Sequence, residues 1–166
     1  MEHDLTGILE GGKIKLSADN IRNLMRCLLE GINHCHKKGL MHRDIKASNL
    51  LLNNRGQLKI ADFGLARRLD TDDPARRYTN KVITLWYRPP ELLLGNELYG
   101  PEIDMWSIGC ILGELYNRRP IFRGDKEFDV LEQISKIAGT PNVVVWPSVH
   151  ECALFGFFSK GMFKKR

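Results

Sequence analysis

Four polar side chains in one short stretch are of the types that phosphoryl transfer requires: Asp44, Lys46, Asn49 and Asp62. A carboxylate such as Asp44 can accept or orient the proton of an attacking hydroxyl, and a cation such as Lys46 can lie near the transferred phosphate. The oxygen atoms of Asn49 and Asp62 are the kind of ligand that Mg²⁺ prefers. Either aspartate alone would be interpreted as an ordinary turn residue, so the prediction depends on the combination.

The spacing of these residues completes three short motifs that follow one another along the chain. Residues 42–49 read HRDIKASN, residues 62–64 read DFG, and residues 89–91 read PPE where APE is usual. Each motif alone would be a weak signal, but three in this order, with a hairpin predicted between the first two, are specific. On these motifs the chain resembles the protein kinase family. The resemblance covers about residues 1–150, and residues 151–166 are expected to be a divergent or truncated tail.

The hydrophobic pattern predicts the elements that must hold these motifs in place. A helix over residues 18–38 has one apolar face, with Ser17 suited to cap its start and Gly39 suited to a left-handed turn at its end. The other predicted elements are helices over residues 101–116 and 125–138 and a hairpin with strands at 50–52 and 58–60. The helix from 101 is apolar on nearly every side, which is typical of the centre of a core. The predicted fold is mainly α with a small β-hairpin, as in a truncated C-terminal lobe of the protein kinase (α+β) fold.

The segment between Asp62 and Glu91 resembles the activation segment of the cyclin-dependent kinases. In that group the threonine aligned with Thr79 is phosphorylated, and the resemblance implies the same here. A phosphate adds about two negative charges, and Arg43 and Arg67 stand at family positions that clamp it. Without the resemblance, Thr79 would be interpreted as a polar loop residue.

Later residues of the same segment align with positions that touch the substrate. Thr84 aligns with the residue whose hydroxyl bridges the base, Asp44, and the lysine, Lys46. The positions that shape a pocket for a proline just after the target Ser or Thr are Val82, Ile83 and Arg88. The resemblance therefore implies Ser-Pro or Thr-Pro substrates. Over residues 53–67 and 79–95 the chain most resembles the transcriptional kinases that pair with cyclin K and phosphorylate the C-terminal heptad repeat of RNA polymerase II.

Two further groups of residues take their roles from the resemblance alone. Met1, Asp4 and Leu51 align with the hinge and floor of an ATP site, where Asp4 would lie near the ribose. Asp104 aligns with an aspartate that braces the backbone of the catalytic loop; a capping acid near a helix start is a second interpretation, compatible with the first. Glu91 aligns with a structural glutamate whose arginine partner would lie in later helices.

The resemblance also implies what a complete enzyme of this kind needs. ATP and Mg²⁺ are the expected cofactors, and a cyclin of the cyclin K type is the expected partner. The chain begins where the hinge is expected, so the glycine-rich loop, the strand lysine and the main cyclin contacts would lie in an N-terminal lobe outside it. We therefore expect the 166-residue chain alone to bind ATP poorly, to be inactive and to expose apolar surface.

Composition sets broad limits on the class of protein. Hydrophobic residues make up 43% of the chain, which suits one globular domain, and no apolar run approaches the roughly 20 residues of a membrane helix. No signal peptide is visible at the N-terminus. The formal charge of +5 suits an acidic partner, but no nucleic-acid motif accompanies it. We expect neither a membrane partner nor direct binding of nucleic acid.

The cysteines indicate the compartment. They are Cys27, Cys35, Cys110 and Cys152, with no C-x-x-C pair. Three of them lie among apolar residues, as free thiols in a reducing compartment do, and the resemblance implies the nucleus, otherwise the cytoplasm. Histidines flank Cys35, but neighbouring residues on a helix point in different directions, which disfavours a zinc site.

Three functions compete on the sequence alone. The first is a cyclin-dependent Ser/Thr protein kinase that transfers the γ-phosphate of ATP. The second is a non-catalytic, truncated regulator that competes for substrate or partner, and the third is a nucleic-acid-binding module, favoured only by the charge. The intact catalytic residues favour the first. Phosphate transfer to a Ser-Pro peptide, with Asp44→Asn as control, separates the first two.

Overall fold

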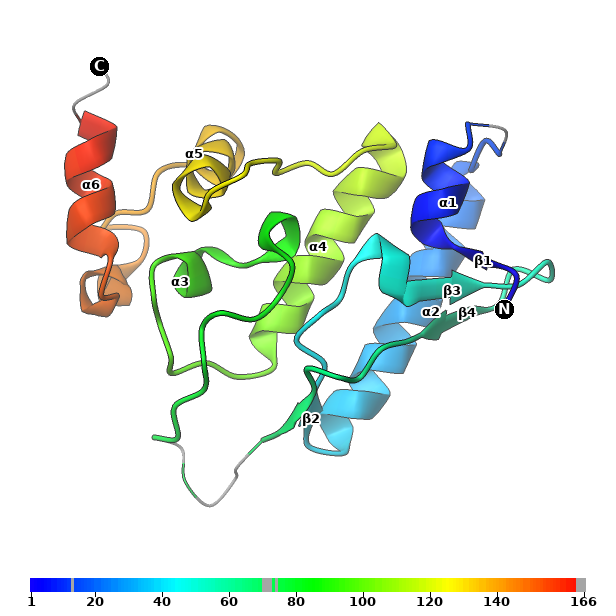
Figure 1. The fold of residues 1–166 in the computed structure, drawn as a ribbon, viewed down its shortest axis with the longest axis horizontal. Helices are drawn as coiled ribbons and strands as arrows, with labels where there is room; N and C mark the ends of the chain where they lie inside the picture. The colour runs from blue at the N-terminus through cyan, green and yellow to red at the C-terminus, as the bar shows by residue number, and fades with distance from the viewer. Residues whose placement is uncertain (13, 70–72, 74, 164–166) are drawn as a thin grey trace.

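The computed structural model describes residues 1–12, 14–69, 73 and 75–163, with the backbone alone for residues 161–163 (Figure 1). Its α-helices are α1 (Leu5–Glu10), α2 (Ala18–Lys37), α3 (Pro90–Leu93), α4 (Glu102–Asn117), α5 (Glu127–Ala138) and α6 (Phe155–Phe163). Its strands are β1 (His3–Asp4), β2 (Leu40–Met41), β3 (Leu50–Leu52), β4 (Leu58–Ile60) and β5 (Arg67–Arg68). Short 3₁₀ helices lie at Ala47–Asn49, Leu85–Tyr87 and Pro147–Glu151. The prediction of a mainly helical fold with a small hairpin is confirmed.

Helix α2 is the helix predicted over residues 18–38, and its ends are set by local chemistry. Ser17 Oγ accepts a hydrogen bond from Asn20 N at 3.1 Å, and Asn20 Oδ1 accepts one from Ser17 N at 3.0 Å. This reciprocal cap satisfies two amides that the helix leaves free. Beyond its C-terminal end, Gly39 has a φ of 69°, a left-handed conformation that glycine adopts without strain. The buried face of α2 consists of Ile21, Leu24, Leu28 and Ile32.

The strands form two small antiparallel groups that bracket residues 42–49, which we call the catalytic loop after its predicted role. In the first group, β3 and β4 form the predicted hairpin, and β1 pairs with β3 so that Asp4 lies opposite Leu51. In the second, β2 pairs with β5 so that Met41 lies opposite Arg67. The catalytic loop leaves β2 and ends at β3, so both of its ends are anchored in sheet.

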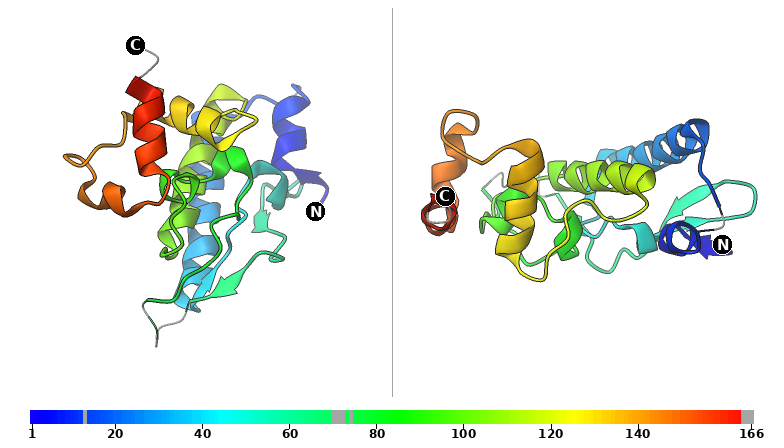
Figure 2. Two further views of the ribbon diagram at one scale, coloured as in Figure 1. Left: turned by 60° about the vertical axis from the view of Figure 1, so that its left-hand side comes forward. Right: turned by 90° about the horizontal axis from the view of Figure 1, so that it is seen from above.

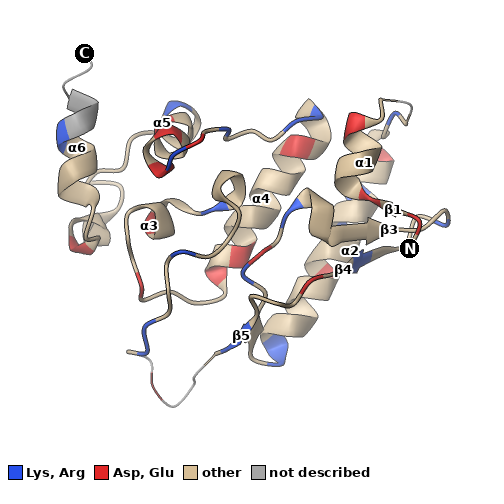
Figure 3. Cartoon of the chain, viewed as in Figure 1, with Lys and Arg blue, Asp and Glu red and all other residues tan. Residues whose placement is uncertain are grey.

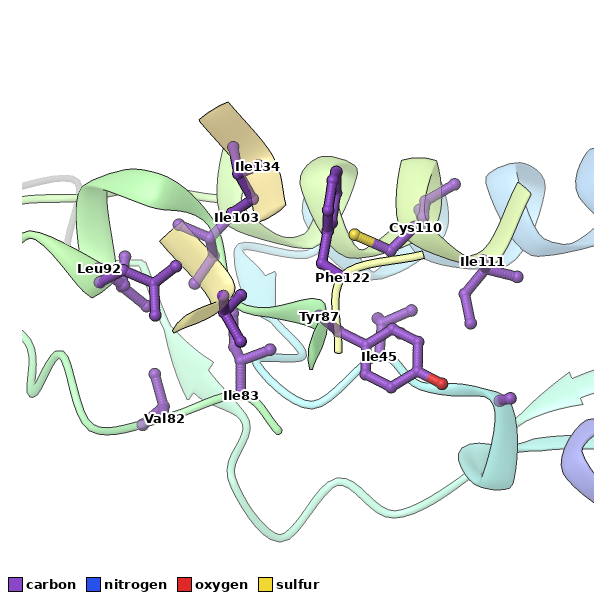
Figure 4. Close-up of a cluster of buried hydrophobic side chains, with 14 of the residues drawn as sticks. Ile45, Val82, Ile83, Tyr87, Leu92, Ile103, Cys110, Ile111, Phe122 and Ile134 are labelled. Carbon is purple, nitrogen blue, oxygen red and sulfur yellow. The ribbon is translucent and has the colours of Figure 1, made fainter. Parts of the chain in front are cut away.

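The main core joins the catalytic loop to the segment that follows the DFG motif. Figure 4 shows Ile45 of that loop beside Tyr87, and Val82, Ile83 and, from α4, Ile103 belong to the same cluster of buried side chains. All five side chains are buried. The apolar contacts therefore hold the two segments that carry the candidate catalytic residues in one fixed arrangement.

Helix α4 runs beside α2 through the middle of the molecule (Figure 1, Figure 2). Ile103 and Ile111 on its inner side are fully buried, but Met105, Leu112 and Tyr116 are 45%, 40% and 64% exposed. The expectation that this helix is buried on nearly every side is wrong for that face. The reason is that the described elements pack against only part of the circumference of α4.

The C-terminal part contains an element that the sequence did not predict. Helix α6 follows residue 151, and its Phe158 is buried edge-on against Phe128 of α5, with ring centroids 5.6 Å apart. Leu154 N donates to Leu94 O at 3.0 Å, which joins this part of the chain to the end of α3. Glycines interrupt the sequence of α6, so no apolar face stands out in it.

Charged residues are distributed over the whole fold. Figure 3 shows basic and acidic residues together on α2 and α5, whereas α1, α3 and α4 carry acidic residues and no Lys or Arg. Of the helices in the described ranges, none combines the length and the apolar character needed to cross a membrane.

Candidate active site

The catalytic loop, residues 42–49, is held by a buried aspartate of helix α4. Asp104 Oδ1 accepts a hydrogen bond from Arg43 N at 2.8 Å, and its Oδ2 accepts one from His42 N at 2.9 Å. Oδ2 also lies 2.8 Å from His36 Nε2, on α2. Arg43 has a φ of 66°, which is uncommon for a residue other than glycine. The carboxylate of Asp104 thus lies against the amides on both sides of a turn that would otherwise be unfavourable.

Several donors converge on the carboxylate of Asp44. Its Oδ1 accepts hydrogen bonds from Thr84 Oγ1 at 3.0 Å and from Thr84 N at 3.3 Å. Its Oδ2 lies 2.8 Å from Lys46 Nζ and 3.2 Å from Asn49 Nδ2. Lys46 Nζ also donates to Thr84 Oγ1 at 3.2 Å. The structure therefore brings the three predicted catalytic side chains, Asp44, Lys46 and Thr84, into one hydrogen-bonded group, which we call the Asp44 group.

The surroundings of Asp44 favour its ionised form. Burial acts to raise the pKa of this carboxyl, whereas the Lys46 ammonium and the hydrogen bonds from Thr84 act to lower it. The lowering contributions together outweigh burial, so the pKa of Asp44 lies below its ordinary value of 3.8. A buried, ionised carboxylate in this position can accept a proton from a hydroxyl placed against it.

The two predicted magnesium ligands offer oxygen atoms at the end of the catalytic loop. Asn49 Nδ2 donates to Asp44 O at 2.8 Å, which directs the amide oxygen of Asn49 away from that carbonyl. Ala61 N donates to Asn49 O at 2.9 Å, so Asp62 follows directly beyond the loop. Asp62 has a φ of 60°, and its Oδ1 accepts a hydrogen bond from Gly64 N at 3.1 Å. An amide oxygen and a carboxylate are a donor set that fits a hard cation such as Mg²⁺.

The residues predicted to form a proline pocket lie on one continuous turn. Ile83 has a φ of 66°, and its carbonyl accepts hydrogen bonds from Arg88 Nε at 3.2 Å and Nη2 at 3.1 Å. Arg88 Nη1 also pairs with Glu127 of α5 at 2.7 Å. Val82 and Ile83 are both buried. The carbonyl oxygen of Ile83 is therefore already occupied by a donor from within the chain.

Thr79 is exposed and is linked to one of the two predicted clamp arginines. The hydroxyl of Tyr99 donates to Thr79 O at 2.5 Å and accepts a hydrogen bond from Arg43 Nη1 at 3.0 Å. Arg43 is buried, and its Nε donates to Leu65 O at 2.8 Å. Arg67 donates to the carbonyl of the preceding residue at 2.8 Å. Its positive charge acts to lower the pKa of the Tyr99 hydroxyl, which burial raises. Both arginines thus lie near Tyr99, but only Arg43 bonds to it.

The predicted ATP-binding residues lie on and beside the first sheet. Asp4 of β1 lies opposite Leu51 of β3, and Leu51 is half-buried. Asp4 Oδ1 accepts a hydrogen bond from Gly7 N at 2.9 Å, so this carboxylate also caps α1. Met1 precedes β1 and is 48% exposed. The backbone that leads from the catalytic loop into β3 therefore places Leu51 close to the N-terminal residues.

Glu91 lies in the first turn of α3 and is half-buried. Burial raises the pKa of its carboxyl, and the nearby charge of Glu102 adds to the rise while a backbone hydrogen bond opposes it. Burial of the Glu91 carboxyl therefore favours its neutral form.

His36, which is next but one to His34 and adjacent to Cys35, and His42, in the catalytic loop, both have partners within the chain. His36 Nε2 faces Asp104 as described above, and His42 Nε2 lies 3.1 Å from Ala61 O. Burial lowers the pKa of His42 and so favours its neutral form. In the described part of the chain, no group of three or more His, Cys, Asp or Glu side chains is placed to hold a metal ion.

A groove of about 350 Å³ opens next to the Asp44 group. Lys46 and Thr84 belong to its lining, together with neighbouring residues of the two 3₁₀ helices at Ala47–Asn49 and Leu85–Tyr87. The remaining lining comes from α1, from the end of α4 and from the loop that follows α4. Arg118, just after α4, has a φ of 57° and donates to Ile14 O at 2.8 Å and to Leu9 O at 3.0 Å. These bonds fix the end of α4 against α1. We call this feature the α1–α4 groove.

Sequence reasoning missed three side chains that support the site: His36, Tyr99 and Glu127. Each bonds to a predicted site residue that is distant in the sequence, namely Asp104, Arg43 and Arg88. No local pattern marks such pairs, so only the fold reveals them.

Several known proteins have sequences similar to this chain. The protein kinase domain family matches residues 1–162, which extends past residue 150 into α6. Cyclin-dependent kinase 12 of Drosophila melanogaster is 59% identical over 155 residues, covering 93% of this chain and 13% of the fly protein. Cyclin-dependent kinase 12 of Caenorhabditis elegans is 56% identical over 152 residues, covering 91% of this chain and 20% of the worm protein. The chain therefore spans a small part of the length of these relatives.

Solved structures show the same fold. The crystal structure of the yeast RNA Pol II CTD kinase CTDK-1 complex has a chain with a TM-score of 0.89 and 46% identity, covering 94% of this chain and 50% of that one. The Chaetomium thermophilum CAK complex bound to ATP-gamma-S has a chain with a TM-score of 0.86 and 41% identity, covering 90% of this chain and 46% of that one. The described fold is thus a mainly helical part of the kinase fold. With the family matched over nearly its whole length, the chain belongs to the protein kinase domain family, and its relatives are cyclin-dependent kinases.

Proposed function

We propose that the protein containing this chain is a cyclin-dependent Ser/Thr protein kinase, which transfers the γ-phosphate of ATP to Ser-Pro and Thr-Pro sites. The observation that carries this proposal is the Asp44 group, in which Lys46 Nζ and Thr84 Oγ1 lie 2.8 Å and 3.0 Å from the Asp44 carboxylate. An ionised carboxylate held beside an ammonium group is what hydroxyl attack on a phosphate needs.

Each member of the group then has a defined task. Asp44 orients the substrate hydroxyl and takes its proton as the hydroxyl oxygen bonds to the γ-phosphorus and the bond to ADP breaks. Lys46 stabilises the negative charge of the transferred group, and Thr84 holds Lys46 and Asp44 together. Asn49 and Asp62 would hold Mg²⁺, which when bound neutralises charge on the phosphates of ATP.

The turn at Ile83 supports the preference for proline after the phosphoacceptor. The Ile83 carbonyl accepts two hydrogen bonds from Arg88, so it is not free to accept one from a substrate amide. A substrate residue with an N–H would leave that donor buried without a partner, at a cost of about 1–3 kcal/mol. Proline has no N–H and avoids this cost.

The exposed position of Thr79 supports its role as a regulatory phosphoacceptor. A phosphate on its hydroxyl would bring about two negative charges close to Arg43 and Arg67, and such pairs order a mobile segment. Tyr99 bonds both to the backbone of Thr79 and to Arg43. Tyr99 is therefore the residue through which phosphorylation of Thr79 would affect the position of Arg43 in the catalytic loop.

The comparisons support a narrower proposal about substrate, partner and location. One solved relative is a kinase of the RNA polymerase II C-terminal domain, and two sequence relatives are named cyclin-dependent kinase 12. We infer that the heptad repeat of RNA polymerase II is the substrate, that a cyclin of the cyclin K type is the partner, and that the protein acts in the nucleus.

We also propose that residues 1–150 supply the hinge and the larger lobe of a two-lobed enzyme. The chain covers about half of the length of each matched chain in the two solved structures. Met1, Asp4 and Leu51 would form only one side of an ATP-binding site. The chain alone would then bind ATP weakly and be inactive. Its exposed Leu112 and Tyr116 favour the alternative that a protein of this length acts as a competing regulator.

One set of assays tests these statements. The complete protein that contains this chain, purified with its cyclin, is given ATP, Mg²⁺ and heptad-repeat peptides in which the proline after the target serine is kept or replaced by alanine. We expect phosphate transfer to the Ser-Pro peptide, and about five- to 150-fold less to the Ser-Ala peptide, as an unpaired amide predicts. Equal transfer to both would refute the proline pocket, and no transfer to either would refute the kinase proposal. Inhibition of the complete enzyme by the 166-residue chain would support the regulator.

A further inference from the structure

We propose that the α1–α4 groove selects substrates with an anionic side chain, a carboxylate or a phosphate, upstream of the phosphoacceptor, and that Arg119 and Arg123 are the selecting residues. The inference rests on the proposed function, because the Asp44 group defines where the phosphoacceptor lies.

The direction of the substrate follows from two fixed points. The turn formed by Ile83 and Arg88, which would contact the residue after the phosphoacceptor, is tied to α5 through Glu127. The α1–α4 groove opens from the Asp44 group toward α1. In Figure 1, α5 and α1 lie on opposite sides of the catalytic loop. A substrate that places its proline at Ile83 therefore sends its upstream residues into the groove.

The charged lining of the groove is predominantly basic. It consists of Lys46, Arg118, Arg119 and Arg123, with Glu10 and Glu114 as the acidic members. Three of these groups are already engaged within the chain. Lys46 pairs with Asp44, Arg118 donates to the carbonyls of Ile14 and Leu9, and Glu114 accepts a hydrogen bond from the Tyr87 hydroxyl at 2.7 Å. The charged groups that remain available to a substrate are therefore two cations, Arg119 and Arg123, and one anion, Glu10.

Arg123 is held in position before any substrate arrives. Its guanidinium carbon lies 5.2 Å from the centre of the Trp86 ring, and Trp86 Nε1 donates to Gly124 O at 2.9 Å, which fixes that ring. Stacking leaves the edge of a guanidinium free to donate to a carboxylate or a phosphate. Arg119 is exposed, and in the described part of the chain it forms neither an ion pair nor a side-chain hydrogen bond. Two cations at one groove, one of them preorganised, favour an anionic partner over a neutral one.

Peptide binding to the 166-residue chain tests the inference without requiring catalysis. Five fluorescein-labelled Ser-Pro peptides are compared, each with one glutamate at a different position from the first to the fifth upstream of the serine. A sixth peptide has alanine at all five of these positions. Fluorescence anisotropy at low salt gives each dissociation constant. We expect glutamate at one or two adjacent positions to tighten binding about fivefold, the size of a partly exposed ion pair, and phosphoserine there to tighten it further.

Charge variants of the groove sharpen the test. Arg119→Gln with Arg123→Gln should abolish the preference, and Arg119→Glu with Arg123→Glu should reverse it toward lysine-containing peptides. Glu10→Gln should strengthen it. Arg26→Gln on α2 is the matched control, since Arg26 is an exposed arginine outside the groove, and it should change nothing. Circular dichroism establishes that each variant is folded.

The outcomes separate this inference from the proposed function. Equal affinity for glutamate and alanine peptides would overturn it, as would a preference that survives in the Arg119 and Arg123 variants, because the overall basic charge would then be the cause. A preference that disappears with these two arginines supports it, even if the complete protein transfers no phosphate. Phosphate transfer without any acidic preference would leave the kinase proposal intact and overturn only the inference about the groove.

Discussion

The charge of Asp44 is set by its neighbours. A buried carboxylate on its own would have a raised pKa, and Lys46 and Thr84 reverse that tendency. Because the pKa in the folded state is below the ordinary value, ionised Asp44 stabilises the fold at pH values above 3.8. That contribution is lost as the pH falls through the folded-state pKa. At neutral pH the carboxylate is therefore available to accept a proton.

Replacing Lys46 tests this balance directly. In Lys46→Met, burial should dominate and the pKa of Asp44 should rise above its wild-type value, because the ammonium that stabilises the ionised carboxylate is gone. The measurement is a pH titration of the Asp44 carboxyl carbon by NMR. Lys59→Met, on the exposed side of β4, is the control and should leave that titration unchanged. An unaltered Asp44 titration in Lys46→Met would contradict the account.

Asp104 should be among the most sensitive residues for stability. Asp104→Asn keeps the shape of the side chain but replaces an acceptor oxygen with an NH₂ group facing buried amides of His42 and Arg43. We expect a loss of about 3 kcal/mol in the free energy of unfolding, as for a broken buried network. Urea unfolding measures it. Asp19→Asn, whose side chain is 77% exposed, should cost less than about 0.5 kcal/mol; equal losses for the two variants would argue against the bracing role.

At the scale of elements, two glycines offer a matched test of helix geometry. Gly39 has a φ of 69° and follows α2, whereas Gly109 lies inside α4, and a Cβ atom at either position would meet nothing within 4 Å. Gly39→Ala should destabilise the fold by roughly 1–2 kcal/mol through its left-handed backbone alone. Gly109→Ala should stabilise it by about 0.5–1 kcal/mol. Thermal unfolding reports both, and the same sign for the two substitutions would show that backbone conformation is not the cause.

The predictability of each element depended on how local its signal is. The cap at Ser17 and the spacing of apolar residues predicted α2 correctly, with an error of one residue at its C-terminal end. Helix α6 was not predicted, because glycines interrupt its apolar pattern. At the site, Asp44, Lys46 and Asn49 lie in one loop, so their spacing alone indicated their chemistry. Their supports are not local: Tyr99 bonds to a residue 56 positions away and Glu127 to one 39 positions away. Such contacts depend on how helices pack, which periodicity does not encode.

At the scale of the whole molecule, the exposed face of α4 should govern behaviour in solution. Leu112 lines a shallow apolar groove between α2 and α4 together with Leu29 and Tyr116, all of them exposed. We expect the 166-residue chain to self-associate at micromolar concentration, because apolar area in water favours association. Sedimentation velocity over a range of concentrations measures this.

Substitutions on that face identify the cause of association. Leu29→Gln with Leu112→Gln should reduce self-association and leave the midpoint of urea unfolding nearly unchanged, since both side chains are about 40% exposed. Asn23→Gln, at an exposed polar position of α2 outside the lining of that groove, is the control and should not reduce self-association. Association that persists in the leucine variant would place the contact elsewhere on the molecule.

The most direct test of the account is a single-turnover measurement of phosphate transfer. The protein containing this chain is mixed, together with the proposed cyclin partner, with ATP, Mg²⁺ and a Ser-Pro peptide. The rate is compared for wild type, Asp44→Asn and the exposed control Asp19→Asn. Loss of the proton acceptor should lower the rate by about 10²–10⁴, the usual contribution of a general base, while Asp19→Asn keeps the wild-type rate. A wild-type rate in Asp44→Asn would show that the Asp44 group is not the catalytic centre.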